Sequence, residues 1–128
     1  MVLGALPLHA DDAEPPKVHK QGGSTYVSGG GDAAHRKAMF TVAPKYPIQL
    51  IFEVHGEVDG VKGVKVTLRD IKGDAILEAV SEGPYFYINP PAGGRYTIEA
   101  EINGEKQSMT KDLVGRRYLI LEYKFAAS

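Results

Sequence analysis

The sequence predicts an all-β protein: a seven-stranded antiparallel, immunoglobulin-like β-sandwich with one short helix near its N-terminus. Apolar and polar residues alternate with a period of two through most of the stretch from residue 48 to residue 125. Turn-forming residues separate the alternating segments, and the 128-residue chain holds 15 glycines and 8 prolines. Short strands at regular spacing, joined by tight turns, are typical of a two-sheet sandwich.

Length and composition indicate one soluble globular domain. The hydrophobic fraction is 43% and the charged fraction 24%, which are ordinary values. The 15 basic and 16 acidic residues give a net charge of −1. This balance argues against a nucleic-acid-binding protein and against attraction to an anionic membrane surface. The chain has no cysteine, which excludes disulfides, thiolate zinc sites and a cysteine nucleophile.

The first residues resemble the end of a secretory signal peptide. Residues 1–10 (MVLGALPLHA) are mainly apolar and end in a small residue before Asp11 and Asp12. We interpret residues 1–10 as the remnant of such a signal and expect an exported bacterial protein, periplasmic or secreted. No stretch approaches the roughly 18 apolar residues of a membrane-spanning helix, so no transmembrane segment is expected.

Residues 11–31 are expected to form a flexible leader. Two consecutive prolines and two glycine clusters disfavour a regular element there. Tyr26 and Val27 are the side chains that could anchor this leader on the domain.

A short helix is expected at residues 33–40. Asp32 is a suitable N-cap, because its carboxylate can accept a hydrogen bond from the first turn. Pro44 and Pro47 prevent the helix from continuing. The sandwich domain is therefore placed at residues 32–126.

Seven strands are expected from the region after the helix. They lie at residues 48–54, 64–69, 75–81, 85–88, 96–102, 105–111 and 118–125. Gly73 is expected at positive φ in the turn between the second and third strands. Asn103-Gly104 predicts a type I′ hairpin, because both central residues of that turn need positive φ. The polar strand that follows it is expected at a sheet edge.

Two stretches resemble a known family. Residues 63–70 (GVKVTLRD) precede the Gly73 turn, and residues 90–98 (PPAGGRYTI) lead into a strand and a hairpin. This pattern resembles the transthyretin-like, carboxypeptidase regulatory-like domain family, and in particular its small exported bacterial members. The resemblance covers residues 28–125. It implies a seven-stranded prealbumin-like sandwich that accompanies other activities and carries no reaction of its own, and it implies no ligand.

The expected function is a non-enzymatic binding or accessory module, with two alternatives. The first is a small hydrolase on a transthyretin-like scaffold, similar to hydroxyisourate hydrolase. That family would demand a Tyr-Arg-Gly-Ser ending, whereas this chain ends YKFAAS. The second alternative is a structural protein that assembles through exposed sheet edges.

Few residues are suited to catalysis or metal binding. The histidines are His9, His19, His35 and His55. No serine lies in a nucleophile elbow. Only His55-Gly56-Glu57 offers two neighbouring metal ligands, whereas a site needs three or four. No catalytic residue, metal site or cofactor is therefore expected.

Tyr85-Phe86-Tyr87 is the densest aromatic cluster. Alternation places Tyr85 and Tyr87 on one face of a strand and Phe86 on the other. If Phe86 and Ile88 lie in the core, both tyrosines face outward and could bind a ligand by stacking. In the alternative, they pack under a loop with their hydroxyls at the rim. The expected partner is an unknown protein or a carbohydrate, not a nucleic acid, and the expected state is a monomer or weak dimer.

Overall fold

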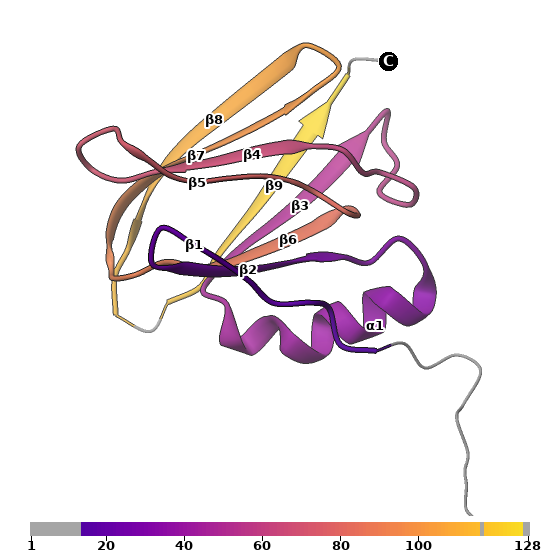
Figure 1. Cartoon of the computed structure of the whole chain (residues 1–128). Coiled ribbons are helices and arrows are strands. Elements are labelled where there is room, and N and C mark those ends of the chain that lie inside the picture. The colour runs from indigo at the N-terminus through magenta and orange to yellow at the C-terminus, as the bar shows by residue number, and fades with distance from the viewer. Residues whose placement is uncertain (1–13, 116, 127–128) are drawn as a thin grey trace, which may run out of the picture.

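Two β-sheets pack face to face in the computed structural model, which describes residues 14–115 and 117–126 (Figure 1). The strands of this part of the chain are β1 (His19–Gln21), β2 (Ser24–Gly29), β3 (Ile48–Val54), β4 (Lys65–Arg69), β5 (Ala75–Val80), β6 (Tyr85–Asn89), β7 (Gly94–Ile102), β8 (Glu105–Leu113) and β9 (Leu119–Phe125). Helix α1 (Ala33–Val42) and the 3₁₀ turn η1 (Ala43–Lys45) connect β2 to β3. The predicted all-β sandwich with one short helix is confirmed, with nine strands in place of seven.

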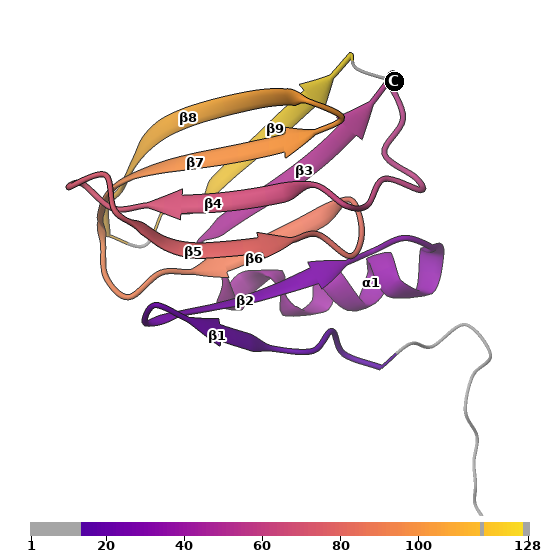
Figure 2. The same cartoon turned by 45° about the horizontal axis from the view of Figure 1, so that its top comes forward.

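The strand order is β1-β2-β6-β3-β9 in one sheet, called sheet A, and β5-β4-β7-β8 in the other, sheet B. Neighbouring strands are antiparallel except β3 and β9, which run parallel. The expectation of a wholly antiparallel sandwich is wrong at this pair. Strand β8 ends at the end of the sandwich where β3 begins (Figure 2). Strand β9 begins at that same end and therefore runs alongside β3 in the same direction.

Much of the segment expected to be a flexible leader is β-structure. Gly22 and Gly23 have φ values of 57° and 78° and form a tight turn between β1 and β2. Strand β2 pairs with β6, and Val27 is buried. Tyr26 stacks on Phe86 with ring centroids 5.2 Å apart. The expectation was wrong here because glycines that disfavour a regular element can also supply the turn of a hairpin.

Helix α1 begins where the sequence predicts and runs two residues further. Asp32 is its N-cap and accepts a hydrogen bond from the backbone N–H of His35 at 2.9 Å. The turn η1 follows directly, with Pro44 near its start. Met39 is buried where α1 covers the outer face of sheet A (Figure 2).

The structure bears on the expected absence of a membrane-spanning helix but not on the expected signal peptide. Residues 1–10, interpreted as a signal remnant, lie outside the described residues. Within the described residues, no helix has the length and apolar character needed to cross a membrane.

Two glutamine side chains tie the edges of the two sheets together. Gln21 of β1 donates to the carbonyl of Glu78 at 3.0 Å and accepts from the backbone N–H of Glu78 at 2.7 Å. At the other pair of edges, Gln107 of β8 donates to the carbonyl of Lys124 in β9 at 2.6 Å. These bonds occupy backbone groups of β5 and β9 that could otherwise pair with a foreign strand.

The main core lies between the two sheets. Its largest fully buried side chains include Phe52, Phe86 and Tyr123. The hydroxyl of Tyr123 donates to the carbonyl of Ile98 at 2.7 Å, which links sheet A to sheet B through the core. A second, smaller cluster lies between sheet A and α1. The two clusters leave sheet A buried on both faces over strand β6.

Candidate functional site

The two tyrosines of β6 are buried beneath α1. Phe86 and Ile88 lie in the main core, so the predicted alternation is correct. Tyr85 and Tyr87, however, are only 8% and 2% exposed. Their place on the outer face does not expose them, because α1 and the turn after it cover that face. The predicted stacking surface is therefore not available to a ligand.

Their surroundings give these tyrosines a structural role. Tyr85 and Tyr87 pack with Val27, Met39 and Tyr46 in the second cluster. Burial, together with the neighbouring Tyr85, raises the pKa of Tyr87 to about 12, as expected for a hydroxyl held away from water. Both rings pack between sheet A and α1 and so stabilise the position of the helix on the sheet.

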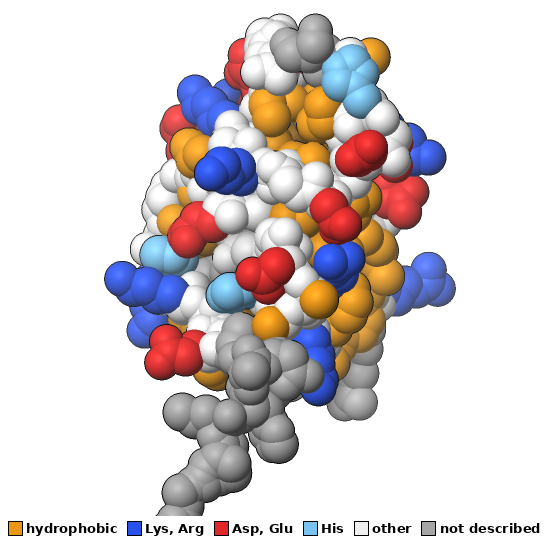
Figure 3. Space-filling view, turned by 90° about the vertical axis from the view of Figure 1, so that its right-hand side faces the viewer, with side chains coloured by type: hydrophobic (Ala, Val, Ile, Leu, Met, Phe, Trp, Pro, Cys, Tyr) orange, Lys and Arg blue, Asp and Glu red, His pale blue; other side chains and the backbone are white. Residues whose placement is uncertain are grey.

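A groove of about 430 Å³, here called the α1 groove, lies beside the start of α1. Its lining comes from four separate parts of the chain: Glu14, Pro15, Pro16 and Lys17; Ser28, Gly29, Gly30 and Gly31; His35, Ala38 and Met39; and Glu82. Figure 3 looks onto this end of the molecule and shows acidic, basic and histidine side chains around exposed hydrophobic ones. The groove therefore combines an apolar floor with a charged rim.

Close backbone packing builds the glycine wall of the groove. A Cβ on Gly30 would lie 2.4 Å from the Tyr85 ring, and a Cβ on Gly83 would lie 2.4 Å from the backbone of Gly29. The Ser28 hydroxyl donates to the carbonyl of Tyr85 at 3.0 Å and accepts from the backbone N–H of Glu82 at 2.8 Å. These contacts fix the β5–β6 connection, and with it Glu82, against the end of β2.

The rim of the α1 groove is mainly acidic. Glu82 lies 3.6 Å from the His19 ring, and its side chain is 67% exposed. Asp32, between two lining residues, accepts hydrogen bonds from the backbone and ring of His35, and these bonds lower its pKa. Glu14 and Glu82 belong to the lining itself, which contains one lysine, Lys17. The electrostatics of the groove therefore favour a cationic ligand.

The described histidines do not form a common site. His19 stacks on Tyr26 at 5.0 Å, and His35 is bonded to Asp32 on α1. His55 lies in a turn with a φ of 53° and borders a second, shallower groove of about 340 Å³. Among the residues that the structure describes, no three histidine or carboxylate side chains are grouped to hold a metal ion. His9 lies outside them.

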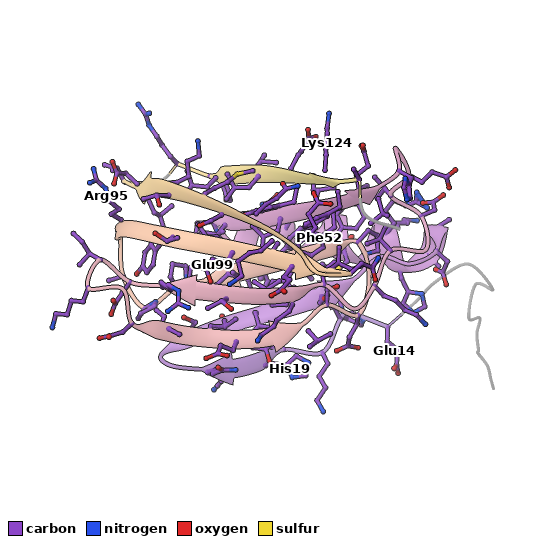
Figure 4. The ribbon with its side chains drawn as sticks, turned by 90° about the horizontal axis from the view of Figure 1, so that it is seen from above. Glu14, His19, Phe52, Arg95, Glu99 and Lys124 are labelled. Carbon is purple, nitrogen blue, oxygen red and sulfur yellow. The ribbon has the colours of Figure 1, made fainter. Side chains whose placement is uncertain are left out.

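The outer face of sheet B carries polar side chains that pair with one another (Figure 4). Arg69 and Glu99 are 3.3 Å apart, and Arg95 and Asp112 are 2.8 Å apart. The hydroxyls of Thr97 and Thr110 on neighbouring strands share a hydrogen bond of 2.9 Å. Because these groups satisfy each other, this face offers less to a ligand than the α1 groove does.

The α1 groove was not predicted from the sequence. One signal was present: a run of three glycines directly before an N-cap residue, which leaves backbone exposed beside the start of a helix. The contributions of residues 14–17 and Glu82 depend on the β1–β2 hairpin, which the sequence did not predict.

Comparison with known proteins does not assign a function to this groove. No family model matches the chain, and a search of curated proteins finds no significant match.

Proposed function

We propose that the chain is a non-enzymatic, exported binding module of the transthyretin-like, carboxypeptidase regulatory-like group. In this proposal the α1 groove takes a basic segment of a protein partner in the periplasm or at the cell surface. The single observation that carries the proposed ligand is the acidic rim around an apolar floor.

The architecture after α1 supports the family assignment. Strands β3 to β9 account for seven strands in two sheets, which is the number that the resemblance implies. The loop in the motif at residues 90–98 is closed by the Tyr96 hydroxyl, which donates to the carbonyl of Ala92 at 2.6 Å. The export assignment depends on residues 1–10 and on the family resemblance.

The chemistry of the groove supports a lysine or arginine side chain as ligand. Such a side chain has an aliphatic stem that can lie on apolar surface while its charged end stays near water. Met39, Ala38 and the two prolines offer that surface, and Glu14 and Glu82 offer carboxylates at the rim. The volume falls within the range of roughly 300–1,000 Å³ that ligand pockets occupy. A carbohydrate is less favoured, because Tyr85 and Tyr87 are not exposed for stacking.

The hydrogen bonds of the groove support binding rather than hydrolysis. A serine nucleophile must pass its proton to a neighbouring base. Ser28 instead donates to the carbonyl of Tyr85 and accepts from the backbone of Glu82. The ring of His35 is bonded to Asp32 at 2.8 Å. Neither side chain is poised for proton transfer to the other.

A pair of blocked tripeptides tests this function. Isothermal titration calorimetry should show that acetyl-Lys-Lys-Lys-amide binds and acetyl-Glu-Glu-Glu-amide does not. The double variant Glu14→Gln/Glu82→Gln should bind the lysine peptide about tenfold more weakly, because each exposed ion pair contributes up to about 1 kcal/mol. Ala38→Phe should block the groove and abolish binding.

A matched helix variant controls for this change. Ala33→Phe places the same side chain on α1, at an exposed residue outside the groove lining, and should leave binding intact. Equal affinity for both peptides would contradict the proposal, as would unchanged binding by the double variant.

A further inference from the structure

The end of the sandwich opposite the α1 groove gathers connections from distant parts of the sequence. The turn η1, the β4–β5 turn, the β6–β7 loop and the β8–β9 connection all lie at this end, on the left in Figures 1 and 2. In Figure 4, Arg95 lies at this end of the sandwich, whereas Glu14 and Lys124 lie towards the opposite end. This end is therefore clear of both ends of the described chain.

Exposed apolar side chains project from two of these connections. Ile71 in the β4–β5 turn is 76% exposed, and Val114 in the β8–β9 connection is 62% exposed. Tyr118 is 49% exposed, and its hydroxyl donates to the carbonyl of Pro44 at 2.7 Å, which joins this connection to η1. These three side chains expose apolar surface on connections at the same end of the sandwich.

The turn that carries Ile71 is held in one conformation. The carboxylate of Asp70 accepts hydrogen bonds from the backbone N–H groups of Lys72 and Asp74 at 3.0 and 3.1 Å. Arg69 donates to the carbonyl of Gly73 at 3.1 Å. The exposure of Ile71 is thus fixed by the turn and does not result from a loose loop.

Basic residues lie on or next to the same connections: Lys45 in η1, Lys72 in the β4–β5 turn, Arg117 between β8 and β9, and Lys111 near the end of β8. Lys45, Lys72, Lys111 and Arg117 are exposed, and none of them makes an ion pair within the part of the chain that the structure describes. We call this surface, with Ile71, Val114 and Tyr118, the basic end.

The acidic side chains nearby offset this charge only in part. Asp112 is paired with Arg95 at 2.8 Å, and Asp70 caps its own turn. Asp74 remains as an exposed carboxylate in the same turn. The basic end therefore carries more exposed cations than carboxylates, although the net charge of the whole chain is −1.

We propose that the basic end docks on an anionic lipid bilayer. Ile71, Val114 and Tyr118 enter the headgroup region, where apolar side chains and tyrosine are stabilised. The lysines and the arginine contact lipid phosphates. A soluble polyanion would satisfy the charges but leave Ile71 in water, so the apolar tips favour a bilayer. The balanced composition, which predicted no attraction to an anionic membrane surface, does not reveal this grouping, because the basic residues come from connections far apart in the chain.

Docking in this orientation has a consequence for the α1 groove. The groove lies at the opposite end and would face away from the bilayer, open to a partner. The two proposals remain independent, because failure of the tripeptides to bind would leave the lipid result unaffected.

Co-sedimentation of the full chain with vesicles tests the docking. Phosphatidylcholine vesicles should bind little, whereas vesicles with about 30% phosphatidylglycerol should bind clearly, since each basic residue near such a surface contributes about 1 kcal/mol, or roughly fivefold. The variant Lys45→Gln/Lys72→Gln/Arg117→Gln should bind about a hundredfold more weakly. The variant Lys62→Gln/Lys106→Gln/Lys124→Gln changes the net charge equally at the other end and should bind like the natural protein.

Ile71→Ser separates a bilayer from a soluble polyanion. It should weaken binding to anionic vesicles several-fold and leave retention on a heparin column unchanged. Its exposed position makes unfolding no explanation, and a circular dichroism melt checks this. Absence of binding to anionic vesicles, equal losses in the two triple variants, or no effect of Ile71→Ser on vesicle binding would each overturn the proposal.

Discussion

Tyr123→Ala is expected to lower the free energy of unfolding by about 4 kcal/mol, a large part of the stability of a domain of this size. Tyr123 is fully buried and packs between Phe52 and Phe125 at ring-centroid distances of 6.0 and 6.5 Å. The substitution removes an aromatic ring from the main core and leaves a cavity between the sheets. It also removes the hydrogen bond to the carbonyl of Ile98.

Urea denaturation measures this effect, and two further variants divide it. Tyr123→Phe keeps the ring and should cost only about 1–2 kcal/mol, the contribution of the buried hydrogen bond. Ile120→Ala lies on the same strand at a side chain that is 60% exposed, and it should change stability by less than about 1 kcal/mol. Similar losses for Tyr123→Ala and Ile120→Ala would contradict the placement of Tyr123 in the core.

Gly83→Ala is expected to destabilise the protein by about 2–3 kcal/mol. The added methyl would lie 2.4 Å from both the carbonyl carbon and the carbonyl oxygen of Gly29, and backbone atoms cannot move aside as the tip of a flexible side chain can. The β5–β6 connection would then separate from the end of β2. The hydrogen bond from the backbone of Glu82 to Ser28 would be strained at the same time.

Gly31→Ala is the matched control for that variant. Gly31 also borders the α1 groove, yet a Cβ there meets no atom within 4 Å, and its φ is not positive. The free energy of unfolding of the Gly31→Ala variant should stay the same or rise by up to about 1 kcal/mol, because alanine restricts the conformations of the unfolded chain. Thermal unfolding of both variants measures this difference in stability. A Gly83→Ala protein as stable as the Gly31→Ala protein would mean that the two segments are not packed as described.

The fold class was predictable because burial on one face of a strand forces alternation in the sequence. The hairpin at Asn103-Gly104 was predictable for a local reason, and both residues have positive φ, 52° and 82°. The β1–β2 hairpin was missed because its turn and its pairing with β6 leave little apolar pattern in residues 19–29. Local rules describe turns well and describe long-range pairing poorly.

The site was harder to predict than the fold, for the same physical reason. Alternation correctly gave the face on which Tyr85 and Tyr87 lie, but it carries no information about what covers that face. The α1 groove combines residues 14–17, the end of β2, the first turns of α1 and Glu82, which only tertiary packing brings together. The basic end likewise arises from connections far apart in the chain.

Taken together, the two proposals place a different partner at each end of the sandwich. The α1 groove has an acidic rim and suits a basic protein segment, whereas the basic end suits an anionic bilayer. The sandwich lies between these two surfaces, and its sheets are joined by hydrogen bonds from the side chains of Tyr123, Gln21 and Gln107.

The most direct test of the groove as a binding site is an NMR titration of the ¹⁵N-labelled protein with the lysine tripeptide. Amide signals of Ser28, of Gly29 to Gly31, of His35 to Met39 and of Glu82 should shift, while those of the basic end should not. Shifts confined to the basic end, or spread evenly over the surface, would contradict the assignment of the α1 groove as the binding site.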